Sequence, residues 1–259
     1  MKQEYFNMAY TNDLLIFGID NVESKDCRSL PEKRLSILLV KRNKEPFKDY
    51  YALPGGFVNL DESSLKSVSR ILKKETGLDK VYMQQLRMYD DVNRDIRGRV
   101  ITLAYISLVD RTLIKNKLND YANWFDILID EKNDNIEVTL YNEHEKIKYE
   151  VKRETIDVKI DEYNYKIKKS SNKLAFEHEE IIINGVMELR KKVTNTDIAF
   201  NLMPEYFTIG ELKQVYELIL GKKLINAAFR RIISDKIEVT DKMIKTGGHR
   251  PSNLCKYKK

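Results

Sequence analysis

The residues best suited to chemistry lie between Leu53 and Leu78, where a glycine-bearing turn is followed by carboxylates and basic residues at fixed spacing. Ile71, Lys74 and Glu75 are spaced i, i+3 and i+4, so on a helix they share one face. Carboxylates at all three positions would suit magnesium, a hard cation that takes oxygen ligands. This face instead offers an aliphatic group, an ammonium and a single carboxylate. We therefore expect a site from which most of the metal ligands are missing.

The same segment resembles the Nudix box, G-x5-E-x7-R-E-U-x-E-E-x-G-U, where U is aliphatic. The matching positions are Gly56, Glu62, Arg70, Leu72, Glu75, Gly77 and Leu78. Ile71 and Lys74 stand where the box has glutamate. The resemblance implies an α/β/α sandwich with a mixed sheet, and a magnesium site beside a diphosphate. Because two of its carboxylates are lost, we expect no catalytic residues and no metal site; only Glu75 and Glu62 are candidate relic ligands.

Apolar runs and turn signals predict the elements that position this segment. Asp13–Ile19, Leu35–Val40 and Val100–Ile106 are short apolar runs bounded by polar residues, which is typical of buried strands. Pro54 and the two glycines after it predict a turn. Residues 63–76 predict a helix, with a glycine just past its end, where glycine commonly terminates helices.

A stretch of alternating apolar and charged residues follows, from Ile127 to about Lys169. Period two over this length favours half-buried antiparallel strands. We expect an insertion of three or four strands, about residues 127–170, that extends one side of the domain. Residues 176–193 then have the spacing of an amphipathic helix.

The last part of the chain carries the whole excess of positive charge. Residues 202–259 contain nine lysines and three arginines against six acidic residues, whereas residues 1–201 contain 34 basic and 34 acidic residues. A basic module on a neutral body is the electrostatic footprint of a nucleic-acid-binding domain. A solvated lysine-rich tail would have the same charge, so the charge alone leaves both interpretations open.

The pattern within residues 202–259 favours a winged helix-turn-helix. Thr208 and Glu211 form a capping box that opens a helix ending at Gly221. Asn226 is the expected cap of a second helix, Ala227–Asp235. In that helix we expect Phe229, Ile232 and Ile233 to face inward, and Arg230 and Arg231 to be displayed.

Two short strands complete this module. Ile237–Thr240 and Leu254–Tyr257 flank a glycine-rich tip that carries His249 and Arg250. A basic hairpin of this kind is the wing that follows the helices. The residues expected to contact DNA are Arg230, Arg231, His249 and Arg250.

The whole chain resembles the Nudix-related transcriptional regulators, the NrtR family. The resemblance is carried by Ala52–Val58, Arg97–Val100, Leu174–His178 and Gly248–Pro251. It implies a Nudix-like sensor domain at residues 1–195, interrupted by the insertion, joined to a winged helix domain at residues 202–259. Members of the family commonly bind ADP-ribose or a related metabolite, and some sense sugars. They are typically homodimers that bind palindromic operator DNA.

The expected ligand contacts are Phe57, Lys74, Arg97 and Arg99. Guanidinium forks suit phosphate oxygens, although two arginines around a glycine also describe an ordinary basic turn. Lys74 has two interpretations that the sequence leaves open: a surface lysine, or an ammonium that pairs with a diphosphate without metal. We expect Arg70 to pair with a carboxylate of the box, and His178 to be packed or capping.

Composition limits the remaining possibilities. A chain of 259 residues has room for one good-sized domain and a small one. No apolar run approaches the roughly 20 residues that cross a bilayer, and the first residues lack the layout of a signal peptide. Cys27 and Cys255 lie at opposite ends and predict no disulfide framework. We expect a cytoplasmic protein without a membrane partner.

Together these features predict a DNA-binding transcriptional regulator, a repressor, whose degenerate Nudix domain senses ADP-ribose or a related phosphorylated metabolite or sugar, and which requires no cofactor. The alternative is a MutT-like Nudix hydrolase of ADP-ribose or nucleotide sugars, for which magnesium would be needed. A structural or interaction module without a ligand is the third possibility.

Overall fold

The computed structural model describes residues 8–22, 31–114, 118–157, 159–160, 162–244 and 251–258. The strands are β1 (Ala9–Val22), β2 (Glu32–Lys41), β3 (Tyr51–Ala52), β4 (Gly55–Phe57), β5 (Tyr82–Tyr89), β6 (Val100–Val109), β7 (Ala122–Lys132), β8 (Asn135–Tyr141), β9 (Lys146–Asp157), β10 (Glu162–Ser170), β11 (Ile237–Ile244) and β12 (Ser252–Tyr257). The helices are α1 (Ser64–Thr76), α2 (His178–Asn195), α3 (Ile209–Leu220) and α4 (Asn226–Ile233), with short 3-10 turns η1 (Arg111–Leu113) and η2 (Ile198–Leu202). None of the described helices is long and apolar enough to span a membrane.

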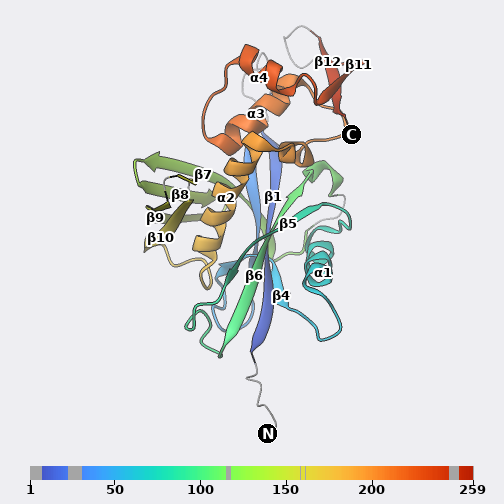
Figure 1. The fold of residues 1–259 in the computed structure, drawn as a ribbon. Helices are drawn as coiled ribbons and strands as arrows, with labels where there is room; N and C mark the ends of the chain where they lie inside the picture. Colours follow the sequence, from blue (N-terminus) through green and yellow to red (C-terminus); the bar gives the residue numbers. More distant parts are fainter. Residues whose placement is uncertain are drawn as a thin grey trace.

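One large mixed sheet organises most of the molecule. Its strands follow the order β10-β9-β8-β7-β2-β1-β6-β5, with β3 paired to β2 and β4 to β1. The β1–β6 pair is parallel and the other pairs are antiparallel. Helix α1 lies on one side of this sheet and α2 on the other (Figure 1). The expected α/β/α sandwich with a mixed sheet is confirmed.

Alternating side chains on the central strands supply the two layers of the core. On β1, Leu15 and Phe17 pack into the larger cluster with α2, whereas Leu14 and Ile16 pack into a second cluster with α1. This alternation follows from the period of two in a strand, whose successive side chains point to opposite faces. The sheet is buried on both faces at its centre, which is why these strands read as continuous apolar runs.

The three or four strands expected from the alternating stretch are present as the second half of β7 and the strands β8 to β10, which extend the sheet beyond β2. On β9 every second side chain from Ile147 to Val151 is buried, and the residues between them are exposed. The buried face belongs to the same core cluster as Ile182 and Val186 of α2. These strands therefore widen the sheet so that it covers α2.

Helix α2 begins two residues later than the periodicity predicts. Phe176 has φ 53°, in the left-handed region, so it cannot continue a right-handed helix backward from His178. The helix then runs along the sheet toward the winged helix at the other end of the molecule (Figure 1). Its first residues and its last turns consequently lie in different parts of the structure.

The C-terminal module has the predicted order of two helices and a two-stranded wing, α3, α4, β11 and β12. The capping box of Thr208 and Glu211 is formed, and Gly221 ends α3 in the left-handed conformation. The capping role expected for Asn226 is wrong. Ile225 occupies the N-cap position without a side-chain hydrogen bond, and α4 runs from residue 226 to 233. The loop before it is held because Glu217 accepts the Leu224 N–H at 2.7 Å, so the helix starts directly afterwards.

The inward face of α4 is also narrower than expected. Phe229 and Ile233 are buried, but Ile232 is 54% exposed. A short helix that packs against its domain along a narrow stripe buries side chains four residues apart, such as Phe229 and Ile233. Ile232 therefore faces outward, a correction to the sequence prediction.

The winged helix shares a core with the sheet. Phe207, Leu212 and Phe229 belong to the same buried cluster as the sheet residues that pack on α2. Polar contacts add to this junction, since Arg190 of α2 donates its Nε–H to the carbonyl oxygen of Ile219 in α3 at 2.8 Å. The packed core thus runs across the boundary predicted between residues 195 and 202.

Candidate functional site

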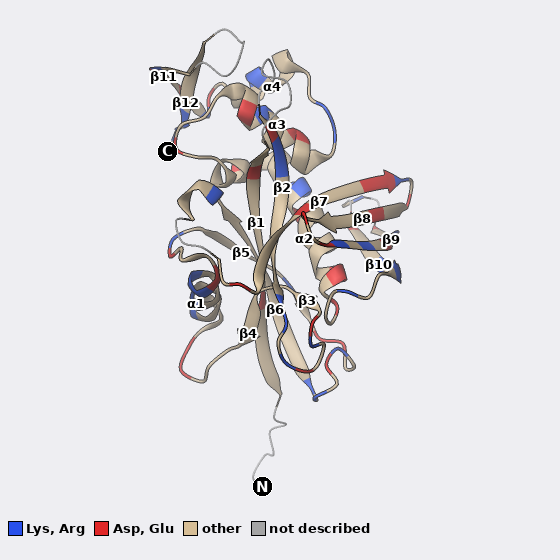
Figure 2. Cartoon of the chain, turned by 180° about the vertical axis from the view of Figure 1, so that it is seen from behind, with Lys and Arg blue, Asp and Glu red and all other residues tan. Residues whose placement is uncertain are grey.

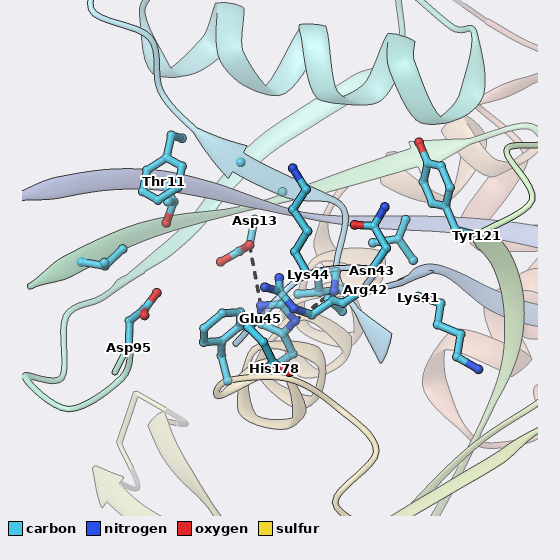
Figure 3. Close-up of a pocket in the computed structure, with 18 of the residues that line it drawn as sticks. Thr11, Asp13, Lys41, Arg42, Asn43, Lys44, Glu45, Asp95, Tyr121 and His178 are labelled. Carbon is cyan, nitrogen blue, oxygen red and sulfur yellow. Dashed lines mark hydrogen bonds and ion pairs between the residues drawn. The ribbon is translucent and has the colours of Figure 1, made fainter. Parts of the chain in front are cut away.

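The turn that opens the Nudix box borders a cavity of about 400 Å³. Its walls come from β1 and β4 in the sheet, the segment 41–45 at the end of β2, the last turn of α1 and the turn before α2. Figure 3 shows Lys44 extended across this cavity toward β4. The volume falls in the range of roughly 300–1,000 Å³ that is typical of small-molecule sites.

The turn packs closely against β1 because Gly55 has no side chain. It pairs with Asp13, and a Cβ at this position would lie 2.3 Å from Asp13 Oδ1 and 2.8 Å from the carbonyl oxygen of Asn12. A Cβ on Gly56, the glycine of the box, would meet no atom within 4 Å. The close approach therefore depends on Gly55.

Asp13 is a buried carboxylate in the cavity wall. Its Oδ1 lies 3.7 Å from His178 Nε2, and its Oδ2 accepts a hydrogen bond from Thr102 at 2.8 Å. Burial is the largest influence on the pKa of Asp13 and would raise it, but His178, Thr102 and Arg94 together hold that pKa below its ordinary value. Nδ1 of His178 accepts the Leu53 N–H at 2.9 Å. His178 is thus the packed residue that was expected, and it joins α2 to the turn of the box.

The ring of Phe176 lies among three guanidinium groups. Arg42 is 5.0 Å from the ring centroid, and Arg94 and Arg97 are each 6.0 Å from it. Phe47, with φ 63°, packs edge-on against Phe176 at 4.8 Å between centroids. Left-handed backbone is costly for residues with large side chains and clusters at functional sites. Phe176 lines the cavity, so this strained residue marks its wall as a candidate ligand contact.

Arg97 lines the cavity, as the sequence predicts. Its Nε and Nη2 donate to the two carboxylate oxygens of Asp95 at 2.9 and 2.6 Å, which lowers the pKa of Asp95. The guanidinium carbon of Arg97 also lies 5.6 Å from the ring centroid of Phe57. Phe57 lines the same cavity and is 49% exposed, so its ring is accessible for stacking.

Lys74 and Glu75 both line the cavity and form an ion pair. Nζ of Lys74 lies 2.8 Å from Glu75 Oε1 and 5.5 Å from the ring centroid of Tyr121. The hydrogen bond with Glu75 is the main reason that the pKa of Lys74 is raised. The one carboxylate that the box retains at this end of α1 is therefore already held by a cation.

Several other box residues, among them Glu62, Arg70 and Ile71, lie outside the cavity lining. Nε of Arg70 donates to Glu62 Oε2 at 3.0 Å, and this pairing is the main cause that lowers the pKa of Glu62 to about 2. The predicted pairing of Arg70 with a box carboxylate is confirmed. Ile71 lies one turn before Glu75 on the same face of α1, where it is buried in the core between α1 and the sheet rather than at the cavity.

The structure does not bring Arg99 into the cavity. The backbone at Gly98 has φ 145°, which breaks the extended geometry that would align Arg97 and Arg99. Nη1 of Arg99 instead donates to the carbonyl oxygen of Asp90 at 2.6 Å. Of the four ligand contacts expected from the sequence, Phe57, Lys74 and Arg97 therefore lie together, and Arg99 lies apart.

The residues present do not fit the magnesium ion that the Nudix box implies. Three of the four lining carboxylates are each held by a basic neighbour, Asp13 by His178, Asp95 by Arg97 and Glu75 by Lys74, which leaves Glu45 as a single carboxylate. Magnesium needs carboxylate oxygens that are free to coordinate it. Within the described ranges, no group of three or more His, Cys, Asp or Glu side chains could hold a metal ion.

Several cavity residues were missed at the level of sequence. Asp13, Arg42, Lys44 and Phe176 all line the cavity. One signal was present, since Arg42 and Lys44 belong to a basic run that directly follows a buried strand. The others come from distant parts of the chain, and only the sheet pairing brings them together.

The candidate DNA-binding face is on α4. Arg230 and Arg231 are exposed there, and basic residues also lie on the loop before α4 and on the wing strands (Figure 2). Arg231 falls between the buried Phe229 and Ile233, and two helical residues turn the side chain by about 200°. It is therefore directed away from the domain. His249 and Arg250, the expected wing-tip contacts, lie outside the described residues.

Both parts of the chain match the models of known protein families. The NUDIX domain model matches residues 29–141, and the model of the NrtR DNA-binding winged helix domain matches residues 199–257. A relative from Acinetobacter baylyi, named ADPR responsive transcriptional repressor NtrR, is 30% identical over 99% of this chain and 84% of its own length. The chain belongs to the NrtR family of Nudix-related transcriptional regulators. Its two parts are accordingly the Nudix-like domain and the DNA-binding winged helix of that family.

Solved structures agree with this NrtR architecture. A MutT/nudix family protein from Enterococcus faecalis has a TM-score of 0.71 at 25% identity, and the match covers 100% of this chain and 89% of that one. NrtR of Shewanella oneidensis, solved in complex with a 27mer DNA, has the same fold, with a TM-score of 0.66 at 24% identity over 96% and 93% of the two chains. A shorter similarity, 45% identity over 29% of this chain and 44% of the relative, is to an ADP-ribose pyrophosphatase of Methanocaldococcus jannaschii.

Proposed function

We propose that this NrtR-family regulator is a repressor that binds operator DNA through α4 and the wing, and ADP-ribose or a related phosphorylated metabolite in the cavity of its Nudix-like domain. The observation that carries this proposal is the similarity, over nearly the whole chain, to a relative named as an ADPR responsive repressor. Binding of the ligand would change the affinity for DNA, because a ligand shifts an equilibrium by its differential affinity for the two states.

The chemistry of the cavity supports a ligand of this kind. ADP-ribose carries a diphosphate, two riboses and an adenine. Arg42 and Lys44 provide cationic donors at the cavity wall, and charge-assisted hydrogen bonds to phosphate are among the stronger ones. The half-exposed ring of Phe57 offers a stacking surface for the base.

We further propose that the protein acts as a homodimer in the cytoplasm and recognises a palindromic operator. A two-fold dimer presents two copies of α4, and a palindrome mirrors that symmetry. Sedimentation of the purified chain, alone and with DNA, tests this part of the proposal. A protein that is monomeric in both conditions would contradict it.

The second candidate is a Nudix hydrolase, favoured by the local similarity to an ADP-ribose pyrophosphatase. The pairing of Glu75 with Lys74 and of Glu62 with Arg70 opposes it, since both relic carboxylates are bound by cations. We therefore propose that the Nudix-like domain binds its ligand without turnover.

A single pair of measurements tests this function. Calorimetric titration with ADP-ribose should show binding at one site per chain, and chromatography of the same mixture with magnesium should show no AMP or ribose 5-phosphate. Rapid magnesium-dependent cleavage that Glu75→Gln abolishes would establish the hydrolase instead. An absence of binding to ADP-ribose, nucleotide sugars and free sugars would remove the ligand from the proposal.

A further inference from the structure

We propose that the ammonium of Lys74 takes the place of a divalent metal, so that this cavity holds the diphosphate of its ligand without magnesium. The inference rests on the proposed function, because it concerns how the same cavity binds its ligand. It goes beyond the loss of two box carboxylates, since it assigns a binding role to the lysine that replaces one of them.

The geometry around Lys74 separates it from an ordinary surface lysine. Its ammonium lies between the carboxylate of Glu75, whose side chain is 4% exposed, and the ring of Tyr121. The Lys74 side chain itself is 62% exposed, so the charge is held at the cavity wall and remains open to a ligand. Lys73, on the same helix, provides the contrast: it pairs with Asp79 at 3.0 Å, both side chains are more than half exposed, and it is outside the cavity lining.

A magnesium ion at Glu75 would compete with this ammonium. The carboxylate oxygen that would coordinate the metal already lies 2.8 Å from Nζ of Lys74. A divalent ion bound there would sit within a few ångströms of a like charge, and that repulsion grows as the distance shortens. The same arrangement leaves the ammonium available to a phosphate oxygen, because lysine has three N–H donors and Glu75 uses one.

One ammonium paired with a carboxylate does not balance the charge of a diphosphate, so other cations must contribute. Arg42 and Lys44 line the same cavity, and no carboxylate lies within ion-pair distance of either among the residues that the structure describes. Nε of Arg42 donates to the carbonyl oxygen of Pro46 at 2.8 Å, which leaves the rest of its guanidinium for an anion. Burial, and then the nearby Arg97, lower the pKa of Arg42, so an incoming anion would relieve an unfavourable environment.

The three cations thus come from two elements that β1 holds beside each other. Lys74 comes from the end of α1, and Arg42 and Lys44 come from the segment after β2. Figure 3 shows Lys44 directed into the space between these elements. This arrangement is suited to one diphosphate held by fixed ammonium and guanidinium groups.

The test compares ligand binding with and without metal. ADP-ribose is titrated calorimetrically into wild-type protein, Lys74→Gln, Lys74→Arg and the matched control Lys73→Gln, each in EDTA and in magnesium. We expect equal wild-type affinity in the two buffers. Lys74→Gln should weaken binding about 10-fold or more in EDTA, as expected for the loss of a charge-assisted hydrogen bond. Lys74→Arg should keep most of the affinity, and Lys73→Gln should match wild type.

Two results would overturn the inference: wild-type binding that requires magnesium, or a Lys74→Gln protein that binds as tightly as Lys73→Gln. Thermal unfolding of each variant without ligand shows whether it is folded. Lys74→Arg keeps a cation beside Glu75, so it controls for a structural effect of leaving Glu75 unpaired. Inorganic pyrophosphate serves as a second probe. If ADP-ribose does not bind but pyrophosphate raises the melting temperature in EDTA in a Lys74-dependent way, the proposed ligand is wrong and the metal-free anion site stands.

Discussion

At the scale of single residues, the two glycines of the Nudix turn have different roles. Gly55 lies so close to Asp13 that a methyl group would force the carboxylate to move, whereas Gly56 faces open space. We expect Gly55→Ala to lower the free energy of unfolding by about 1–3 kcal/mol, as overpacking does. Gly56→Ala should change it by less than about 0.5 kcal/mol. Urea denaturation of both variants checks this, and equal stabilities would show that the turn relaxes around the added methyl.

The pair of Glu62 and Arg70 makes a prediction about pH. In the folded state Arg70 lowers the pKa of Glu62 from an ordinary 4.5 to about 2. A depressed carboxyl pKa stabilises the folded state above the unfolded pKa, and this contribution is lost as pH falls from about 5 toward 2. Glu62→Gln should therefore be less stable than wild type at pH 6, and the difference should shrink toward pH 3.

Thermal unfolding over that pH range measures the effect. Asp79→Asn is the matched control, because its partner Lys73 is more than half exposed and solvent screens the pair. A Glu62→Gln protein whose stability runs parallel to wild type at every pH would show that the pair contributes nothing.

Much of the residue-level picture could be predicted from the sequence, and its limits are physical. The box spacing located Lys74 and Glu75 because helical periodicity converts sequence distance into a shared face. The same rule does not say how far along the helix the cavity extends, and Ile71, one turn before Glu75, packs against the sheet instead. Asp13 and Phe176 both line the cavity, although 163 positions separate them in the sequence. Only the sheet and the turn before α2 bring them to one cavity.

At the scale of elements, α4 gives the sharpest prediction. Arg231 points away from the buried side chains of Phe229 and Ile233, whereas Arg230 lies to one side. We expect Arg231→Ala to cost about 1–3 kcal/mol of discrimination between operator and random duplex, as loss of a good base contact does. Arg230→Ala should weaken both duplexes alike and reduce the log–log salt slope by about 0.9, as for one phosphate contact. Fluorescence anisotropy over a salt series separates the two outcomes, and the reverse assignment would contradict the orientation of α4.

The elements themselves were predicted with uneven success. Strands and helices with strong periodicity, such as α1 and the strands β8 to β10, were found because a buried face imposes its period on the sequence. The start of α4 was missed by one residue because the helix begins at Asn226 without a side-chain cap, so no capping residue marks it in the sequence. Strand β5 was not predicted, since only one of its eight residues is buried and its sequence shows no apolar run.

At the scale of the whole molecule, α2 connects the cavity to the winged helix. Its first residue, His178, lines the cavity, and Arg190 on the same helix contacts the end of α3 and forms an ion pair with Glu131 of β7. We expect Arg190→Met to keep ADP-ribose affinity but to reduce the effect of ADP-ribose on DNA binding. Lys191→Met, at an exposed neighbouring position, is the control. A full response in Arg190→Met would show that the coupling follows another route.

The central claim is that one chain binds both DNA and a phosphorylated ligand, and that the two affinities are linked. The most direct measurement first selects a duplex that full-length protein binds from a random pool. The anisotropy of this labelled duplex is then followed as protein is added at fixed salt, once with ADP-ribose and once without it. We predict tight, salt-dependent binding that ADP-ribose shifts by roughly 5-fold or more, the usual range for coupled sites. Identical binding curves with and without a ligand that calorimetry shows to be bound would contradict the account.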